Sequence, residues 1–294
     1  MERRPHGPPR AAPVGVHDLP SRARSPFHTF HQGGHMADRS SAEHQLWLRS
    51  FHQPAPGAPR LLCLPHAGGS ASFYFPVSKA LAPAVDVLAV QYPGRQDRRL
   101  EPPADSVQEL AQGVFRALDE REDTPLALFG HSMGAMVGFE LARLLEAAGR
   151  PPAVFFVSGR RGPSVERVEN VHLGGDARLI EEVAKLDGTD AALLQDEEML
   201  DLILPALRAD YRVVETYRRT PGPRPSCPFV VLTGDADPRV TPEEARAWEQ
   251  ETDGPFELHV YPGAHFYLVE QQQAVLDRIG TTLRRLAPGA GAVA

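Results

Sequence analysis

A serine held between two glycines is the residue of this sequence best suited to covalent chemistry. Ser132 lies at the centre of residues 130–134, GHSMG. A short apolar run, residues 125–129, precedes this pentapeptide, and an apolar-faced helical pattern, residues 133–148, follows it. A tight turn from a strand into a helix exposes the serine hydroxyl beside the first N–H groups of the helix, where an oxyanion is stabilised. The context therefore predicts a nucleophilic serine. The pentapeptide alone would also fit an ordinary turn.

A serine hydroxyl becomes a good nucleophile only when a base removes its proton, and the base needs an acid to orient it. Three histidines follow Ser132 in the chain, namely His172, His259 and His265. His265 comes in a loop after the last predicted strand, so we expect it to be the base. His172 lies in a helical region and His259 within a strand, and both positions fit structural roles better.

Two aspartates follow the apolar run at residues 229–233 and are candidates for the acid. Asp235 stands directly after a glycine, where aspartate commonly caps a turn. Asp237 stands further along the loop, from which it can reach a histidine on the next loop. We therefore expect Asp237 to orient His265.

The stabilisation of an oxyanion needs a second N–H donor, which usually comes from the loop after an early strand. The apolar run at residues 60–64 leads into residues 65–70, PHAGGS. We expect the backbone N–H groups of Ala67 and Met133 to form the donor pair, and His66 to be structural. The alternative is that the two glycines only turn the chain.

Strand and helix patterns alternate around these residues. The expected strands are residues 60–64, 85–90, 125–129, 153–158, 229–233 and 257–261, and the expected helices are about residues 72–82, 106–121, 133–148, 242–252 and 268–286. Nearly continuous apolar strands, each followed by a helix, indicate a mainly parallel sheet covered on both faces. The chain order serine, aspartate, histidine is that of the α/β-hydrolase arrangement. The predicted fold class is α/β, an α/β-hydrolase fold.

One interval is much longer than a crossover requires. About 70 residues separate the strands at residues 153–158 and 229–233. They contain helical patterns at about residues 176–187, 196–204 and 205–217. Because open α/β sheets bind ligands beyond the carboxyl ends of their strands, we expect a helical lid at about residues 165–220. A plain set of crossover helices is the alternative.

Composition and charge set the boundaries of the domain and the kind of partner. Residues 1–40 are rich in proline and lack apolar periodicity, so we expect a disordered N-terminal extension, a domain over residues 41–288 and a flexible C-terminus at residues 289–294. The formal charge is −7. Residues 1–35 carry five arginines against two acidic residues, and the remainder holds 26 basic against 36 acidic residues. This acidic body argues against nucleic acid or an anionic membrane as a partner.

Neither a membrane span nor the apolar core of a signal peptide is evident in the sequence. The chain has two cysteines, Cys63 and Cys227, and both lie beside predicted strands. We expect buried, reduced thiols and a cytoplasmic location.

At this point the sequence resembles the type II thioesterases that accompany modular polyketide and non-ribosomal peptide synthases. The resemblance spans about residues 45–285. It rests on residues 64–70 (LPHAGGS), 91–95 (QYPGR), 130–134 (GHSMG), 234–238 (GDADP) and 263–267 (GAHFY). The first two motifs discriminate much better among α/β-hydrolases than the serine pentapeptide does.

The resemblance implies a triad of Ser132, Asp237 and His265 beneath a helical lid. It also implies hydrolysis of acyl groups from the phosphopantetheine arm of acyl or peptidyl carrier proteins, which removes aberrant or stalled groups through an acyl-enzyme. The phosphopantetheine belongs to the carrier, and no metal or bound cofactor is needed. The alternatives are a terminal cyclising thioesterase, a general carboxylesterase, and a carrier-binding scaffold without activity. Because cyclising domains are usually fused to a synthase, we expect hydrolysis. We also expect the protein to be a monomer.

Arginines next to the predicted strand ends offer a way to dock an acidic carrier. Arg95, Arg98 and Arg99 follow one strand, and Arg160 and Arg161 follow another. We hypothesise that they form a local basic rim where the active site opens. Ordinary solvated arginines are the alternative.

Overall fold

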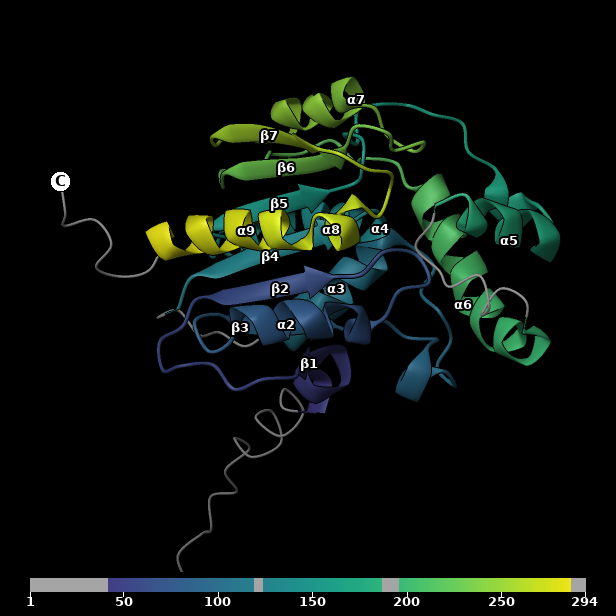
Figure 1. Ribbon diagram of the computed structural model, residues 1–294, viewed down its shortest axis with the longest axis horizontal. Helices are drawn as coiled ribbons and strands as arrows, with labels where there is room; N and C mark the ends of the chain where they lie inside the picture. Colours follow the sequence, from purple (N-terminus) through teal and green to yellow (C-terminus); the bar gives the residue numbers. More distant parts are fainter. Residues whose placement is uncertain (1–41, 119–123, 187–195, 287–294) are drawn as a thin grey trace, which may run out of the picture.

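The computed structural model describes residues 42–118, 124–186 and 196–286 (Figure 1). A seven-stranded sheet runs through it in the order β1-β3-β2-β4-β5-β6-β7. The strands are β1 (Leu48–Ser50), β2 (Arg60–Leu64), β3 (Asp86–Val90), β4 (Leu126–His131), β5 (Val154–Ser158), β6 (Phe229–Gly234) and β7 (Phe256–Tyr261). Only the pair of β1 and β3 is antiparallel. The segments predicted to be disordered or flexible, residues 1–40 and 289–294, lie outside the described residues.

The six predicted strands are present, and burial on both faces explains most of them. All residues of β2, β3 and β5 are buried, whereas β7 at the edge of the sheet is only partly covered. A parallel sheet needs such cover, since its crossover connections place helices on both faces. The seventh strand, β1, was not predicted, because three residues are too few to show a periodicity.

Helices cover the two faces of the sheet and enclose a core on each side. On one face lie α3 (Val107–Ala117) and α4 (Met133–Ala147). The other face carries α2 (Phe75–Leu81), α8 (Tyr267–Glu270) and α9 (Gln272–Leu286), of which α2 and α9 lie in front of the strands in Figure 1. At the β7 edge, α7 (Pro242–Arg246) continues into a 3-10 helix over Ala247–Glu251.

The long interval between β5 and β6 contains α5 (Asp176–Ala184) and α6 (Glu197–Thr216), which stand beyond the carboxyl ends of the strands (Figure 1). The prediction of two helices meeting at residues 204 and 205 is wrong, since Pro205 lies inside one continuous α6. Proline removes one backbone hydrogen bond of a helix. The residues after it, including Leu207 and Tyr211, are buried and hold the second half of the helix in place.

Two expectations about the chain as a whole can be compared with this fold. Within the described segments, no helix is long and apolar enough to cross a membrane. Cys63 and Cys227 are both buried free thiols, as expected.

Candidate active site

Ser132 occupies a strained turn between β4 and α4. Its φ and ψ are 54° and −113°, a region that residues other than glycine rarely adopt. The turn is possible because its flanking glycines have no side chains. A Cβ on Gly134 would lie 2.0 Å from the Leu64 carbonyl oxygen, and one on Gly130 would lie 2.3 Å from the Gly134 carbonyl oxygen. The sequence context thus produces the sharp strand-to-helix turn that presents a serine.

The structure brings His265 and Asp237 together at the same end of the sheet. Nδ1 of His265 lies 2.8 Å from Oδ2 of Asp237, and both side chains are buried. The backbone N–H of Arg239 donates to Oδ1 of Asp237 at 2.8 Å, which fixes the carboxylate. A carboxylate that accepts a hydrogen bond from the Nδ1–H of histidine leaves Nε2 unprotonated, so Nε2 is the basic nitrogen of the imidazole. Asp235 instead accepts from the Gly263 N–H at 3.0 Å and braces the turn.

The two other downstream histidines have partners elsewhere. His172 contacts Glu215 in the segment between β5 and β6, and His259 lies 2.9 Å from Glu257 on β7. Neither lines the cavity that contains Ser132.

That cavity has a volume of about 150 Å³ and contains Ser132, His265 and Ala67 in its wall. The helices α5 and α6 contribute an apolar wall. Its side chains are Val183, Ile203, Leu207, Tyr211 and Val214. Two cationic side chains, Arg160 and Arg239, also line it. The cavity can therefore hold a small, mostly apolar group against the serine.

Two further histidines lie beside His265. The ring centroids of His131 and His265 are 5.0 Å apart, and those of His66 and His131 are 5.9 Å apart. Burial, with smaller contributions from the charges of His265 and Arg95, lowers the pKa of His66 to about 3. Burial likewise places the pKa of His131 well below its usual value. Both rings are neutral at neutral pH, so they add no positive charge that would oppose an imidazolium at His265.

The loop over residues 65–70 is held by an ion pair that the sequence analysis did not identify. Asp210 of α6 binds Arg95 through two contacts of 2.6 and 2.8 Å, and both side chains are buried. The same carboxylate accepts from the Gly68 N–H at 2.7 Å, and Arg95 donates to the Gly69 carbonyl at 3.1 Å. The only sequence signal was an acidic residue within the apolar face of a helical pattern.

The start of this loop lies beside the amino end of α4, since a Cβ on Gly134 would lie 2.0 Å from the Leu64 carbonyl oxygen and 2.8 Å from that of Pro65. The N–H of Met133, the first residue of α4, has no earlier carbonyl of its helix to bond. Ala67 lines the cavity from the facing loop. Met133 directly follows Ser132, which also lines the cavity, and the role of Ala67 and Met133 as the donor pair remains a prediction.

The basic rim expected near β3 is largely absent. Arg95 is buried against Asp210, and Arg98 is buried with two hydrogen bonds to Glu101 at 3.0 and 2.6 Å. The expectation of an exposed rim is wrong for these two side chains, because the carboxylates of Asp210 and Glu101 neutralise them inside the fold. Arg99 is exposed, and its role in docking remains a prediction.

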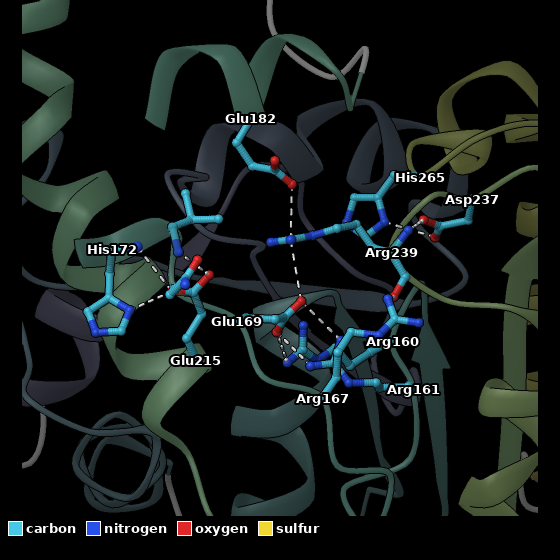
Figure 2. A network of polar contacts seen from close by, with 12 residues as sticks. Arg160, Arg161, Arg167, Glu169, His172, Glu182, Glu215, Asp237, Arg239 and His265 are labelled. Carbon is cyan, nitrogen blue, oxygen red and sulfur yellow. Dashed lines mark hydrogen bonds and ion pairs between the residues drawn. The ribbon is translucent and has the colours of Figure 1, made fainter. Parts of the chain in front are cut away.

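The arginines after β5 are also buried, so they form no exposed rim either. Arg161 donates two hydrogen bonds to Glu169, and Arg160 lies 3.7 Å from that carboxylate. Arg239 lies 3.3 Å from Glu169 and 3.0 Å from Glu182 of α5. Figure 2 shows Glu169 with these arginines gathered around it. This cluster, Arg160, Arg161, Glu169, Glu182 and Arg239, joins the segment before α5 to the loop that carries Asp237.

Among the described residues, no group of three or more His, Cys, Asp or Glu side chains is arranged to hold a metal ion.

A serine on a strained strand-to-helix turn, a buried histidine–aspartate pair and a mainly parallel sheet define an α/β-hydrolase. The model of the thioesterase domain family matches residues 59–283, and the chain belongs to this family. It is accordingly a hydrolase that acts on thioesters.

Curated relatives agree with this assignment. The thioesterase PikA5 of Streptomyces venezuelae is 47% identical over 88% of this chain and 94% of its own length. A probable cadicidin biosynthesis thioesterase of Streptomyces griseus is 48% identical over 83% of this chain and 68% of its own length.

Solved structures agree as well. The type II thioesterase BorB from the borrelidin biosynthetic cluster is 54% identical with a TM-score of 0.77, covering 81% of this chain and 98% of that one. The RedJ thioesterase from the prodiginine pathway of Streptomyces coelicolor is 38% identical with a TM-score of 0.73, covering 80% of this chain and 94% of that one.

Proposed function

We propose that this chain is an editing thioesterase. It removes aberrant or stalled acyl groups from the phosphopantetheine arm of acyl or peptidyl carrier proteins that belong to a polyketide or non-ribosomal peptide synthase. The observation that carries the proposal is a single small cavity lined by Ser132, His265 and Ala67, in a chain whose relatives include type II thioesterases of biosynthetic clusters.

The reaction begins when His265 takes the proton of Ser132 and the hydroxyl oxygen attacks the thioester carbonyl carbon. The N–H groups of Ala67 and Met133 bind the oxyanion of the tetrahedral intermediate. The C–S bond then breaks, and the proton held by His265 passes to the leaving thiol. His265 then takes a proton from water, whose oxygen attacks the acyl carbon. The bond from that carbon to the Ser132 oxygen breaks, the proton passes from His265 to this oxygen, and the free acid leaves. Throughout, Asp237 orients the imidazole and stabilises the imidazolium.

The size and lining of the cavity support a short acyl group as substrate. About 150 Å³ bounded by Val183, Ile203 and Leu207 leaves little room for a long chain while α5 and α6 lie over it. Burial of an apolar acyl group against these side chains contributes roughly 0.8 kcal/mol per methylene. The proposed reaction uses only protein side chains, backbone N–H groups and water, so it requires no cofactor.

The test measures release of the free acid from three substrates that carry the same short acyl group: an acylated carrier protein, an acyl-pantetheine and an oxygen ester. We expect the carrier thioester to have the highest kcat/KM and Ser132→Ala to abolish its turnover. If the oxygen ester were the best substrate, the enzyme would be a carboxylesterase. If Ser132→Ala retained full activity, the proposed mechanism would be wrong.

A substrate with a distal hydroxyl on its acyl chain separates hydrolysis from cyclisation. Hydrolysis yields the free hydroxy acid, which mass spectrometry distinguishes from the lactone. The acid is the expected product, and a lactone as the main product would show a cyclising thioesterase instead.

A further inference from the structure

Arg160 stands in the wall between two cavities. It follows β5 and lines the cavity of Ser132 and His265. It also lines a second cavity, of about 460 Å³, formed by residues 160–168 and the end of α6. Val214 is the other residue that both cavities share. The Arg160 side chain is only 6% exposed, so its guanidinium lies inside the protein at the active site.

This guanidinium lacks the partners that its neighbours have. Nε of Arg160 is buried and has no hydrogen-bond partner among the described residues. Its nearest carboxylate, Glu169, lies 3.7 Å away, beyond hydrogen-bond distance. That carboxylate is already engaged by Arg161 through hydrogen bonds of 3.2 and 2.5 Å and by Arg239 at 3.3 Å (Figure 2).

The local charges are also out of balance. The cluster contains three arginines, Arg160, Arg161 and Arg239, against two carboxylates, Glu169 and Glu182. A third carboxylate nearby, Glu215, accepts hydrogen bonds from the N–H groups of residues 171 and 172 and contacts the ring of His172. The charge of Glu215 also acts on Arg160, but neither Glu215 nor the two carboxylates of the cluster accept a hydrogen bond from Arg160.

Burial, and then repulsion from Arg161, lowers the pKa of Arg160 to about 9, so the side chain stays protonated at neutral pH. A buried guanidinium whose N–H groups lack hydrogen-bond partners is costly to a folded protein, and buried polar groups without a partner commonly bind an ion or a ligand. The planar guanidinium is the side chain best matched to a carboxylate or a phosphate.

We propose that Arg160 forms an anion-binding subsite of the active site, where its guanidinium binds a carboxylate or phosphate group of the thioester substrate. The proposal rests on the proposed function, because the substrate must place its thioester at Ser132. A carboxylate at the far end of a dicarboxylic acyl group would occupy the smaller cavity. The phosphate of the phosphopantetheine arm would instead lie on the side of the larger cavity, which Arg218 and Arg219 also line.

Two matched pairs of substrates separate these sources. The first pair is a succinyl and a pentanoyl thioester of N-acetylcysteamine, which differ in the terminal carboxylate. The second pair is the phosphopantetheine and the pantetheine thioester of one neutral acyl group, which differ in the phosphate. The readout is the ratio of kcat/KM within each pair, for the wild type, for Arg160→Met and for the control Arg212→Met, which removes an exposed arginine of α6 that lines neither cavity.

We expect the wild type to prefer the anionic member of one pair by roughly tenfold or more, the effect of a hydrogen bond to a charged group. In Arg160→Met this ratio falls to about 1, and in Arg212→Met it stays at the wild-type value. If Arg160→Met abolishes the preference within the first pair, the acyl carboxylate is the ligand of Arg160. If it abolishes the preference within the second pair, the phosphate is the ligand. A wild type without preference in either pair overturns the subsite, as does an unchanged ratio in Arg160→Met.

The neutral substrates distinguish this failure from a failure of the proposed function. If the neutral thioesters are turned over and the anionic substrates are not preferred, only the subsite proposal is wrong. If no thioester is turned over, the proposed function is wrong. Thermal unfolding checks the variant, and we expect Arg160→Met to fold, because Glu169 keeps Arg161 and Arg239 as partners and the buried Nε without a hydrogen-bond partner is removed. If it does not fold, Arg160→Lys replaces it, since lysine keeps the charge but cannot bind an oxyanion with a planar fork.

Discussion

The carboxylate of Asp210 in α6 and the N–H of Gly68 are joined by a 2.7 Å hydrogen bond across 142 positions of the sequence. Asp210 also forms the buried ion pair with Arg95, which in turn donates to the carbonyl of Gly69. One ion pair thus fixes the peptide units 67–68 and 69–70 of the loop that carries Ala67. A helix above the strands therefore sets the position of a proposed oxyanion donor.

Removing this ion pair tests whether it positions the donor. Loss of Asp210 alone leaves Arg95 buried and unpaired, which typically costs about 3–5 kcal/mol of stability. The double variant Arg95→Met/Asp210→Leu removes both charges and should fold. Full loss of an oxyanion donor lowers kcat by about 10²–10³, so we expect a misplaced loop to cost roughly 10-fold to 100-fold.

The measurements are kcat on a small thioester and the unfolding temperature. The control is Arg212→Met/Asp105→Leu. It removes an exposed ion pair between Arg212 of α6 and Asp105, whose side chains are 49% and 79% exposed. The control should keep its kcat. A double variant at Arg95 and Asp210 with wild-type kcat would show that the ion pair serves the fold only.

The two aspartates after β6 should differ sharply in their effect on the rate. Asp237 contacts Nδ1 of His265, whereas Asp235 contacts the backbone of Gly263. In a serine protease, replacing the acid of the triad by asparagine lowers kcat by about 10⁴. We expect Asp237→Asn to lower kcat by roughly 10³–10⁴ and Asp235→Asn to lower it by less than about tenfold. Equal losses in steady-state kcat would exclude Asp237 as the orienting acid.

Two glycine-to-alanine substitutions should have opposite effects, one disrupting the active-site turn and the other stabilising a helix. The Cβ of Gly134→Ala would lie 2.0 Å from the Leu64 carbonyl oxygen, so the turn at Ser132 cannot form without moving β2 or α4. Gly280 lies within α9, and a Cβ there would meet nothing closer than Nη1 of Arg284 at 3.3 Å. We expect Gly134→Ala to abolish activity and Gly280→Ala to stabilise the protein by about 0.5–1 kcal/mol. Thermal unfolding and activity assays test both, and an active Gly134→Ala would contradict the tight packing at the turn.

Glu169 should make stability depend on pH in the acid range. Burial alone would raise its pKa, but the hydrogen bond from Arg161 and the charges of Arg160 and Arg239 outweigh burial and lower the pKa to about 2. Because this value lies below the ordinary 4.5, the carboxylate stabilises the folded state fully above pH 4.5. The stabilisation is lost as the pH falls from 4.5 towards 2.

Chemical denaturation of the wild type and of Glu169→Gln across this range measures the effect. We expect the variant to be less stable at neutral pH and its free energy of unfolding to fall less steeply in acid. Parallel curves for the two proteins would mean that Glu169 has the same pKa in the folded and unfolded states.

The local features of the fold could be predicted from the sequence because each depends on neighbouring residues. The apolar run before Ser132 and the glycines on either side of it are enough to specify a strand, a sharp turn and a helix. The break expected at Pro205 was wrong for a related reason. A local rule predicts the end of a helix there, and contacts made by the buried residues that follow override it.

The partners of the arginines could not be predicted in this way. Arg95 and Asp210 are 115 positions apart, and nothing in the local sequence of either residue indicates the other. Arginines at strand ends therefore suggested an exposed rim, while the fold brings Asp210 to Arg95 from the segment between β5 and β6 and turns Glu169 back onto Arg160 and Arg161 within that segment. The pairing of buried charges depends on topology, which the strand and helix patterns do not specify at the level of single side chains.

Labelling with a fluorophosphonate probe tests most directly the central claim that Ser132 is the nucleophile. The account predicts one adduct on each protein molecule, on the peptide that contains Ser132, with thioesterase activity lost in proportion to labelling and no adduct in Ser132→Ala. An adduct on another serine that abolishes activity would contradict the account. So would a folded protein that hydrolyses thioesters at full rate after Ser132 has been modified.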